Sequence, residues 1–270
     1  MKSITSRDNP LYKEFKQLAT SSQARRKAGR TLLDGVHLCE AYFQHLGAPE
    51  YCIVAESSLH HAEVAAVLAQ SEQQRTQCIC LPDALYKALS QVEHGVGVMF
   101  IITTPAPEFP TALASSSVVL DNLQDPGNLG SILRSAAAAG IKNVFCSPGT
   151  AFAWSPKVMR AGMGAHFLLN IFEHVDLPAL LRNTTIQVLA TSSHTRQTIY
   201  QSNLNQEVVW LFGHEGQGVS PELMSMATST VTIPQQAAIE SLNVAASAAI
   251  CFFEQVRQQL DAKTERLPQN

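Results

Sequence analysis

Short apolar runs alternate with amphipathic helical stretches through the first hundred residues of the chain. We expect strands near residue 33 and at 51–55, 77–81 and 96–103. The expected helices span 36–46 and 59–69, and a shorter one starts at Pro82. Strands that alternate with helices in this way predict a small α/β domain with a mainly parallel sheet.

The second half of the chain repeats this alternation with more strongly apolar strands. They are expected at 118–120, 143–146, 186–190, 208–212 and 231–234. The run from Val208 to Phe212 has no polar residue, which is typical of a central strand covered on both faces of a parallel sheet. The pattern therefore predicts a second α/β domain built on a parallel sheet.

Prolines interrupt both patterns between the two halves. Pro105, Pro107 and Pro110 are followed by the small residues of 114–117. Because proline holds the residue before it in an extended conformation, this stretch is expected to be a spacer. The predicted domains cover residues 1–108 and 109–270.

The last helix is expected to be capped by the Ser241 hydroxyl and to run from Leu242 to about Leu260. Between Val244 and Phe253 it is apolar around its whole circumference. Such a helix has to be buried on every side. A helix in the core of one domain meets that requirement, and so does a helix packed between two subunits.

Composition excludes several classes of protein. Hydrophobic residues make up 46% and charged residues 15% of the chain, as in globular proteins. No stretch reaches the roughly 18 continuous apolar residues of a membrane span, and no apolar signal core follows the first residues, so a cytoplasmic protein is expected. The cysteines lack zinc spacing, so we expect reduced thiols and no metal.

Charge is distributed unevenly along the chain. The formal net charge of −3 combines +6 over residues 1–30, −7 over 31–110 and −2 over 111–270, so any RNA-binding surface has to be local. Positive charge gathers at Arg25, Arg26, Lys27 and Arg30. This run is interpreted either as a solvated, fraying arm or as a phosphate-binding segment.

Residues 118–140 are expected to form a strand, a polar loop and a helix that begins near Ser131. Backbone N–H groups at such a helix start can bind an anion. The helical neighbours of Arg134, three and four positions away on either side, carry no charge. Either its guanidinium stays in water, or it binds a group outside the helix such as a phosphate.

A glycine-rich loop, Gly213-His-Glu-Gly-Gln-Gly218, follows the strand at 208–212. It is not a dinucleotide-binding fingerprint, because Glu215 stands where that motif has its second glycine. The glycines allow a close backbone approach to a ligand, but a simple turn would use them equally well.

Three segments of the second half together resemble a known family. Asn128-x-Gly130-x3-Arg134, preceded by Asp125-Pro126, is similar to the first signature motif of the SpoU/TrmH family of RNA ribose 2′-O-methyltransferases, in the SPOUT superfamily. LFGHEGQGVSPEL and IPQQAAIESLNVAASAAICFFE resemble its second and third motifs, in the same order. The resemblance implies a deep trefoil knot in the second domain and a ribosomal-protein-like, RNA-binding fold in the first.

The resemblance also implies the cofactor S-adenosylmethionine, held by backbone groups at the positions that match the family. The candidate cofactor-binding residues are Thr191, Gly213, Glu215, Gly216, Ile233, Gln235 and Leu242. The candidate catalytic residues are Asn128, Arg134, Glu215, Ser241 and Asn243. In this family the proton-accepting role is given to the residue matching Arg134, yet an arginine with a pKa above about 12 is a poor base. Two roles for Arg134 therefore remain open: it acts as the base, or it clamps a phosphate.

The chain departs from the family pattern at three positions. Gln235 stands where Met is usual, Ala237 where Gly is usual, and Gly162 where Ser is usual. Arg160 precedes Gly162 in the segment RAGMGAHFLLNIF. It is interpreted either as a second phosphate contact or as a member of a structural ion pair.

The predicted function is S-adenosylmethionine-dependent methylation of a ribose 2′-hydroxyl, with 23S rRNA favoured over tRNA. The predicted assembly is a homodimer joined through the helix that follows Ser241, without membrane contact. The alternatives are a tRNA 2′-O-methyltransferase, a non-catalytic RNA-binding relative and a doubly wound enzyme that binds small nucleotides.

Overall fold

The structure is a computed structural model that describes residues 1–92, 95–182, 184–236 and 241–265. It contains two compact units: Met1–Pro105 with Trp154–Phe167, and Ala106–Ala153 with the chain from Leu168 onward. The domain boundary predicted from the sequence places Trp154–Phe167 in the second domain. It packs in the first unit because helix α7 (Pro156–Gly162) contacts strand β2 (Arg30–Asp34). The Thr31 hydroxyl also donates to the Trp154 carbonyl, at 2.8 Å.

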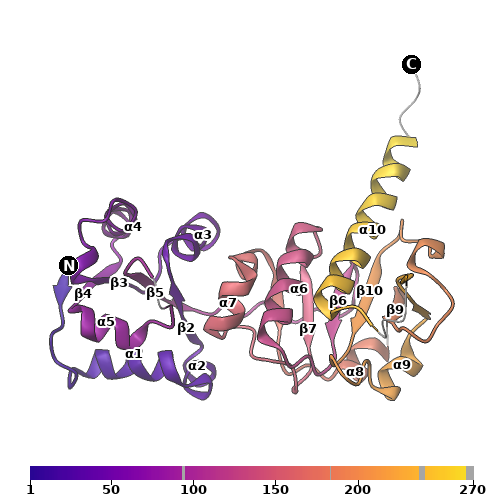
Figure 1. The fold of residues 1–270 in the computed structure, drawn as a ribbon, viewed down its shortest axis with the longest axis horizontal. Helices are drawn as coiled ribbons and strands as arrows, with labels where there is room; N and C mark the ends of the chain where they lie inside the picture. The colour runs from indigo at the N-terminus through magenta and orange to yellow at the C-terminus, as the bar shows by residue number, and fades with distance from the viewer. Residues whose placement is uncertain (93–94, 183, 237–240, 266–270) are drawn as a thin grey trace. The chain divides into compact units, whose positions relative to one another are not determined.

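The first unit combines short helices with one five-stranded sheet (Figure 1). Its other helices are α1 (Pro10–Thr20), α2 (Ser22–Ala28), α3 (Val36–Leu46), η1 (Glu56–Ser58), α4 (Ala62–Gln73) and α5 (Asp83–Leu89). Its other strands are β1 (Lys2–Ser3), β3 (Tyr51–Ala55), β4 (Gln77–Leu81) and β5 (Val98–Thr103).

The sheet of the first unit has the order β1-β4-β3-β5-β2. Strands β1 and β3 run parallel to β4, but β5 runs antiparallel to both β3 and β2. The sheet of this unit is therefore mixed: β5 alone runs against the other four strands, and the prediction of a mainly parallel sheet is wrong for the two pairings that β5 makes. Apolar runs locate strands, whereas strand direction depends on where each connection returns to the sheet.

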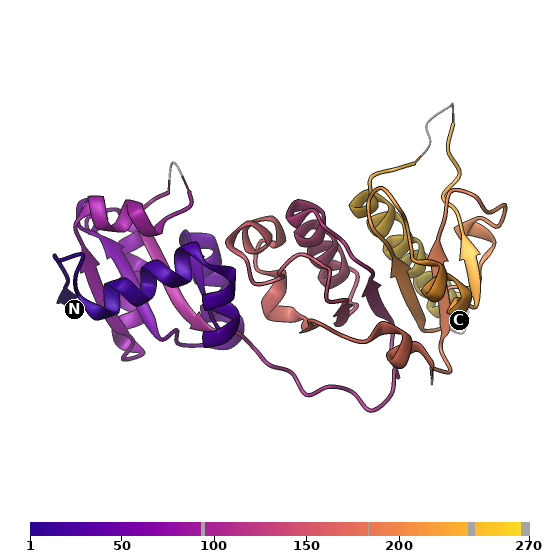
Figure 2. The ribbon, with the colours of Figure 1, turned by 90° about the horizontal axis from the view of Figure 1, so that it is seen from below.

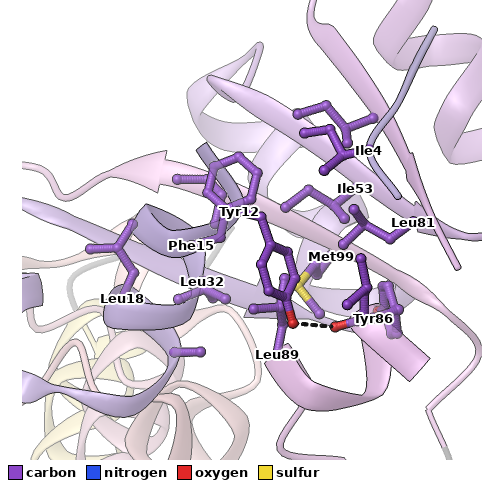
Figure 3. Close-up of a cluster of buried hydrophobic side chains, with 14 of the residues drawn as sticks. Ile4, Tyr12, Phe15, Leu18, Leu32, Ile53, Leu81, Tyr86, Leu89 and Met99 are labelled. Carbon is purple, nitrogen blue, oxygen red and sulfur yellow. Dashed lines mark hydrogen bonds between the residues drawn. The ribbon is translucent and has the colours of Figure 1, made fainter. Parts of the chain in front are cut away.

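Helices α1 and α5 cover one face of this sheet and form a core with it (Figure 3). Phe15 and Leu18 of α1 meet Ile53 and Met99 of the sheet there. Each fully buried side chain of this size contributes about 2 kcal/mol. The Tyr12 hydroxyl reaches into the same core and donates to the Leu85 carbonyl at 3.2 Å, so its polar end is satisfied.

The basic run near the N-terminus is folded, because α2 covers most of it and β2 begins at its last residue. Arg25 is only 6% exposed, and its Nη1 donates to the carbonyls of Leu18 at 2.6 Å and Ala19 at 3.4 Å. Arg30 pairs with Glu14 and Glu50. Both interpretations of the run, a fraying arm and a phosphate-binding segment, are therefore wrong for Arg25 and Arg30, whose guanidinium groups pair within the unit.

The second unit is built on a six-stranded sheet in which every pairing is parallel, as predicted. Its strands, in the order β11-β9-β10-β6-β7-β8, are β11 (Ser229–Val231), β9 (Gln187–Thr191), β10 (Val208–Phe212), β6 (Ser117–Leu120), β7 (Asn143–Cys146) and β8 (Asn170–Phe172). Its helices are α6 (Pro126–Ala138), α8 (Leu177–Arg182), η3 (Ile199–Gln201), α9 (Pro221–Met226) and α10 (Val244–Glu265), with η2 (Ala165–Leu168) at the join between the units. The trefoil knot stays a prediction.

Alternation along β10 divides the second unit into two layers of helices. Val209 and Leu211 pack toward α8 and α9. Trp210 and Phe212 meet Phe252 of α10 on the opposite face. Helix α6 packs against α10, so the two form one layer (Figures 1 and 2). This double covering is why β10 carries no polar side chain.

Helix α10 differs from its prediction at both its start and its outer face. The residue that caps it is Asn243, whose Oδ1 accepts from Ala245 N at 2.9 Å and Ala246 N at 3.2 Å, so Ser241 is not the cap. Phe253 is 49% and Leu260 57% exposed. Burial on every side is therefore wrong for the single chain, which leaves apolar side chains of α10 uncovered.

None of the helices in the described residues has the length and apolar character that a membrane crossing requires.

Candidate active site

A cavity of about 970 Å³ lies at the carboxyl ends of β9, β10 and β11, beside the first turns of α6 and α10. Parallel sheets commonly bind ligands at this edge, where strand ends meet helix starts. The wall includes Asn128, residues 191–194, 213–219, Met224, 231–233, Gln235, 241–244 and Ser247. The segments that resemble the three signature motifs therefore all reach one cavity.

The loop after β10 folds back on itself and forms part of that wall. His214 N donates to Gly218 O at 2.9 Å, and Gly218 N donates to His214 O at 2.8 Å. A Cβ on Gly213 would lie 2.1 Å from the carbonyl carbon and oxygen of Gly218, so no side chain fits there. Gly218 has φ +71°, which glycine adopts without strain. These two glycines are required by closure of the loop itself.

Helix α6 begins earlier than the pattern predicted, at Pro126 and not near Ser131. Asp125 caps it, with its Oδ1 accepting from Asn128 N at 2.8 Å, and Pro126 occupies the first helical position. The sequence analysis interpreted Asp125-Pro126 as part of a loop. The earlier start places Asn128 in the first helical turn, at the cavity.

Glu215 holds the start of α6 against the glycine loop. Its Oε1 accepts from Asp125 N at 2.9 Å and from Asn128 Nδ2 at 3.1 Å, and its Oε2 accepts from Gln124 N at 3.1 Å. Burial alone would raise the pKa of Glu215, but these N–H donors outweigh it and hold the pKa below its usual value. A carboxylate with three donors and a lowered pKa is a poor proton acceptor, and its arrangement is that of a positioning residue.

Asn128 connects Glu215 to the start of α10. Asn243 Nδ2 donates to Asn128 Oδ1 at 2.9 Å. Because Asn243 Oδ1 accepts the N–H groups of α10, its amide can only donate on the other side. Asn128 must therefore accept from Asn243 and donate to Glu215. The orientation of both amides follows from their partners.

One hydrogen-bonded chain, Glu215–Asn128–Asn243, thus links residues of the three motif-like segments along the cavity wall. Its members come from the loop after β10, the first turn of α6 and the cap of α10. The chain explains why an acid and two amides recur in three separate segments: each supplies the partner that the next one needs.

The second unit matches a known family along most of its length. The sequence profile of the SpoU rRNA Methylase family matches residues 115–253, about half of the chain. The chain belongs to the SpoU rRNA Methylase family. The family predicted from the three motifs is thereby confirmed.

Relatives of this SpoU family member match it nearly end to end. An uncharacterized tRNA/rRNA methyltransferase of Synechocystis is 34% identical over 267 residues, covering 97% of this chain and 96% of that protein. A 23S rRNA (guanosine(2553)-2′-O)-methyltransferase of Bacillus subtilis is 27% identical, covering 94% and 98%. The crystal structure of an AdoMet-bound rRNA methyltransferase from Sinorhizobium meliloti has a TM-score of 0.81 at 25% identity, covering 95% and 97%. The likeness extends over both units.

In this SpoU family member the seven candidate cofactor residues all line the cavity. The lining combines Gly213 and Gly216, which have no side chain beyond the backbone, with the apolar residues Ile233 and Leu242. Ser241 also lines the cavity, but it takes no part in the hydrogen-bonded chain. Cofactor binding by these residues remains a proposal.

Arg134 is the candidate that the structure keeps apart from the cavity wall. It lies on α6 six residues after Asn128, which places it about 120° away around the helix. Its side chain is exposed, and within the described part of the chain it makes no hydrogen bond or ion pair. The geometry leaves its guanidinium available to a ligand that approaches α6 from outside.

The remaining expectations concern the RAGMGAHFLLNIF segment and the third motif. Arg160 donates to the Gln91 carbonyl at 3.4 Å. Burial raises the pKa of Asp34, and the nearby charge of Arg160 is one of the weaker effects that oppose this rise, so the surroundings of Arg160 favour the structural alternative. Gly162 ends α7 in the first unit and is buried. Ala237 lies outside the described residues.

Several cavity residues were absent from the sequence-based set. Ser192, Ser193 and His194 follow β9, and the available signal was their position after a predicted parallel strand. His214 lies inside the glycine loop, where its Nδ1 accepts from Gly216 N at 2.9 Å. Among the residues that the structure describes, no three His, Cys, Asp or Glu side chains are placed to hold a metal ion.

Proposed function

We propose that this protein transfers a methyl group from S-adenosylmethionine to a ribose 2′-hydroxyl of RNA, with 23S rRNA as the favoured substrate. The observation that carries the proposal is the Glu215–Asn128–Asn243 chain, which organises one cavity from the three motif-like segments. Family membership and the 23S rRNA 2′-O-methyltransferase name of the B. subtilis relative support the choice of reaction and substrate.

The cavity suits a nucleoside with a polar, charged extension. Its volume of about 970 Å³ is at the upper end of the range for small-molecule sites. Ile233 and Leu242 offer an apolar wall to a flat base, while Thr191 and Ser192 offer hydroxyls to polar groups. When bound, S-adenosylmethionine supplies an electrophilic methyl group on a sulfonium.

The residues of the chain have two tasks in this reaction. The first is in-line placement of the two substrates, which the rigid wall formed by Asn128, Glu215 and Asn243 serves. The second is stabilisation of the ribose oxygen as its proton passes to solvent water and the methyl group leaves the sulfonium as the new substituent of that oxygen. The exposed Arg134 guanidinium on α6 would clamp a phosphate of RNA that approaches this helix from outside, and its positive charge would favour an ionised hydroxyl that the clamp brings near it. A proton-accepting role for Arg134 is the less favourable alternative because its pKa is too high.

We further propose a cytoplasmic homodimer in which the first unit binds the RNA substrate. The exposed apolar side chains of α10, Phe253 and Leu260, favour coverage by a second copy. Arg26 and Lys27 remain exposed on α2 and favour contact with phosphates.

The reaction is tested with purified protein, methyl-labelled S-adenosylmethionine and separate preparations of unmodified 23S rRNA and tRNA. We expect label in 23S rRNA at a nucleotide whose 3′ phosphodiester resists alkali, because a 2′-O-methyl group removes the internal nucleophile. Label in tRNA alone would establish the tRNA alternative. Label released as a methylated base would contradict ribose methylation.

Calorimetry with S-adenosylhomocysteine separates this enzyme from its non-catalytic alternative. Binding of RNA without binding of S-adenosylhomocysteine would establish the non-catalytic RNA-binding relative. Absence of heat and of a thermal shift at millimolar ligand would overturn cofactor binding at this cavity. Failure to bind any RNA would favour a small-nucleotide enzyme.

A further inference from the structure

Two cysteines of the first unit are direct neighbours across its sheet. Cys52 of β3 and Cys78 of β4 are Cα partners in the parallel register of these strands. Because directly paired residues of adjacent strands point to the same face of a sheet, the two thiols lie side by side. Ile53 and Ile79, the next residues along each strand, belong to the core that α1 and α5 cover. The thiols therefore lie on the opposite face, where α4 contacts both strands.

The spacing of these strands suits a disulfide bond. Neighbouring strands lie about 4.8 Å apart. Disulfides join residues whose Cα atoms are about 4.4–6.8 Å apart. Both cysteines are reduced thiols in this structure. A bond between Cys52 and Cys78 therefore needs side-chain rotation and no change of strand pairing.

The two thiols differ in how readily they ionise. Cys52 is fully buried, and its hydrogen bond to Cys78, together with burial, raises its pKa. The same hydrogen bond lowers the pKa of Cys78 against the opposing effect of burial, and 6% of Cys78 is exposed. Because the thiolate is the reactive form, Cys78 is the member of the pair that a small oxidant would meet. Cys52 lies directly behind it as the resolving thiol.

Cys80 shows how a thiol behaves on the same strand without such a partner. It lies two residues beyond Cys78 on the same face of β4 and is 8% exposed, so its exposure is similar. Its partner on β3 is Val54, which offers no thiol, and burial raises the pKa of Cys80. The residue opposite on β3 thus distinguishes the two cysteines.

We propose that Cys52 and Cys78 form a reversible oxidation site for hydrogen peroxide. The Cys78 thiolate attacks one peroxide oxygen, the O–O bond breaks, and the departing hydroxide takes a proton from solvent to become water. Cys78 is thereby oxidised to a sulfenic acid. The Cys52 sulfur then bonds to the Cys78 sulfur, the S–O bond breaks, and the second hydroxide leaves as water with the Cys52 proton. The inference is independent of the proposed methyl transfer, because no residue of the cavity takes part.

The test exposes the full-length protein to hydrogen peroxide, blocks the remaining thiols with iodoacetamide and identifies linked peptides by mass spectrometry. We expect a Cys52–Cys78 linkage that dithiothreitol reverses. Cys80→Ser is the matched control and should keep this linkage. Cys52→Ser should instead leave Cys78 as a sulfenic acid that dimedone labels, and Cys52→Ala serves if the serine variant does not fold.

Alkylation rates at neutral pH give a second readout. Cys78 should react at least about tenfold faster than Cys80, because only the thiolate reacts and the pKa values of the two thiols are shifted in opposite directions. Cys52→Ala removes the hydrogen bond that lowers the pKa of Cys78, so the two rates should then agree within about threefold. Equal rates in the wild-type protein, a linkage through Cys39 or Cys80 in place of this pair, or oxidation of Cys78 that dithiothreitol does not reverse would each overturn the inference.

Discussion

At the scale of single residues, hydrogen-bond partners assign different roles to groups that the sequence placed together as catalytic. Glu215 accepts hydrogen bonds from Asn128 and from two backbone N–H groups, and the Asn128 side chain donates to Glu215 and accepts from Asn243. The Arg134 side chain makes no hydrogen bond or ion pair within the described residues. We therefore expect the first two to act by positioning and the arginine to meet a substrate.

Glu215→Gln tests the positioning role. The folded-state pKa of Glu215 is lowered, so its carboxylate stabilises the protein above the unfolded pKa of about 4.3, and this contribution is lost as the pH falls through the folded value. At pH 7 the free energy of unfolding of the variant should be about 1 kcal/mol lower than that of wild type. The loss is modest because the side chain is largely exposed to solvent. The difference from wild type should shrink below about pH 4.

Urea denaturation at pH 7 and at pH 3.5 measures both effects. Glu108→Gln is the control, since Glu108 is exposed and makes no hydrogen bond within the described residues. A stability loss for Glu215→Gln that stays constant across these pH values would exclude the carboxylate as its cause.

Arg134→Lys separates charge from geometry at the exposed position on α6. Lysine keeps the charge but loses the planar pair of donors. If Arg134 aligns a phosphate or the reacting hydroxyl, methylation should fall by about 10²–10³ while S-adenosylhomocysteine binds normally. If only the positive charge of Arg134 matters, the methylation rate of the lysine variant should stay within about tenfold of the wild-type rate. Single-turnover assays decide, and Arg134→Ala with wild-type activity would remove the residue from the mechanism.

At the scale of elements, helix starts and helix faces carry the function. The first turn of α6 and the cap of α10 bring Asn128 and Asn243 to one wall, and their bond joins positions 115 residues apart. In the first unit, α2 buries Arg25 but exposes Arg26 and Lys27, so residues adjacent in sequence have different surroundings.

Asn243→Asp and Asn243→Ala distinguish the cap of α10 from the cavity wall. Aspartate still caps the helix, so its stability should match wild type within about 0.5 kcal/mol, but it cannot donate to Asn128. The alanine variant loses both the cap of α10 and the bond to Asn128, and its free energy of unfolding should fall by about 1 kcal/mol. Both variants should bind S-adenosylhomocysteine more weakly, as calorimetry would detect. Wild-type affinity in Asn243→Asp would disconnect the Asn128–Asn243 bond from the cofactor.

Variants of α2 test where RNA affinity resides. The double change Arg26→Ala with Lys27→Ala should make RNA binding less sensitive to salt. The slope of log K against log salt concentration should fall in magnitude, for each lost phosphate contact, by up to about 0.9 on duplex RNA and about 0.7 on single strands. Arg25→Ala should leave that slope unchanged and destabilise the first unit by about 1–3 kcal/mol, because it leaves the Leu18 carbonyl buried without its donor. Equal slopes for wild type and the double variant would exclude this part of α2 from RNA binding.

At the scale of the whole molecule, α10 connects the core of the second unit to an uncovered surface. Its inner side packs on β10 through Phe252, and the next residue, Phe253, is 49% exposed. The helix is thus apolar on more sides than one chain covers.

We predict a dimer in solution from this uncovered surface. Light scattering at micromolar concentration should give about twice the chain mass of 29.3 kDa. Phe253→Asp should return it to the single-chain mass, because a buried carboxylate without a partner opposes association. Tyr200→Asp is the control, at a side chain that is 56% exposed outside α10. A wild-type mass near 29 kDa would contradict the dimer.

The sequence by itself determined five of the six strands of the parallel sheet, missing β8, and it determined the glycine loop after β10 and the family. Each of these follows from local information: an apolar run covered on both faces, the turn chemistry of glycine, and the spacing of residues within a motif. The α6 cap was also present in the sequence as Asp125-Pro126, although the pattern of turn-forming residues was interpreted as a loop.

Only the tertiary structure decided the direction of β5, the burial of Arg25 and the separation of Arg134 from the cavity. It also selected Asn243 over Ser241 as the cap of α10. The periodicity of apolar residues shows which side of a helix or strand is buried, but it does not show which other element covers that side. The partner of Glu215 that matters most, Asn128, lies 87 residues away, and no local pattern contains that pairing. Side-chain roles were settled where separate elements meet, because only there does each polar group find or lack its partner.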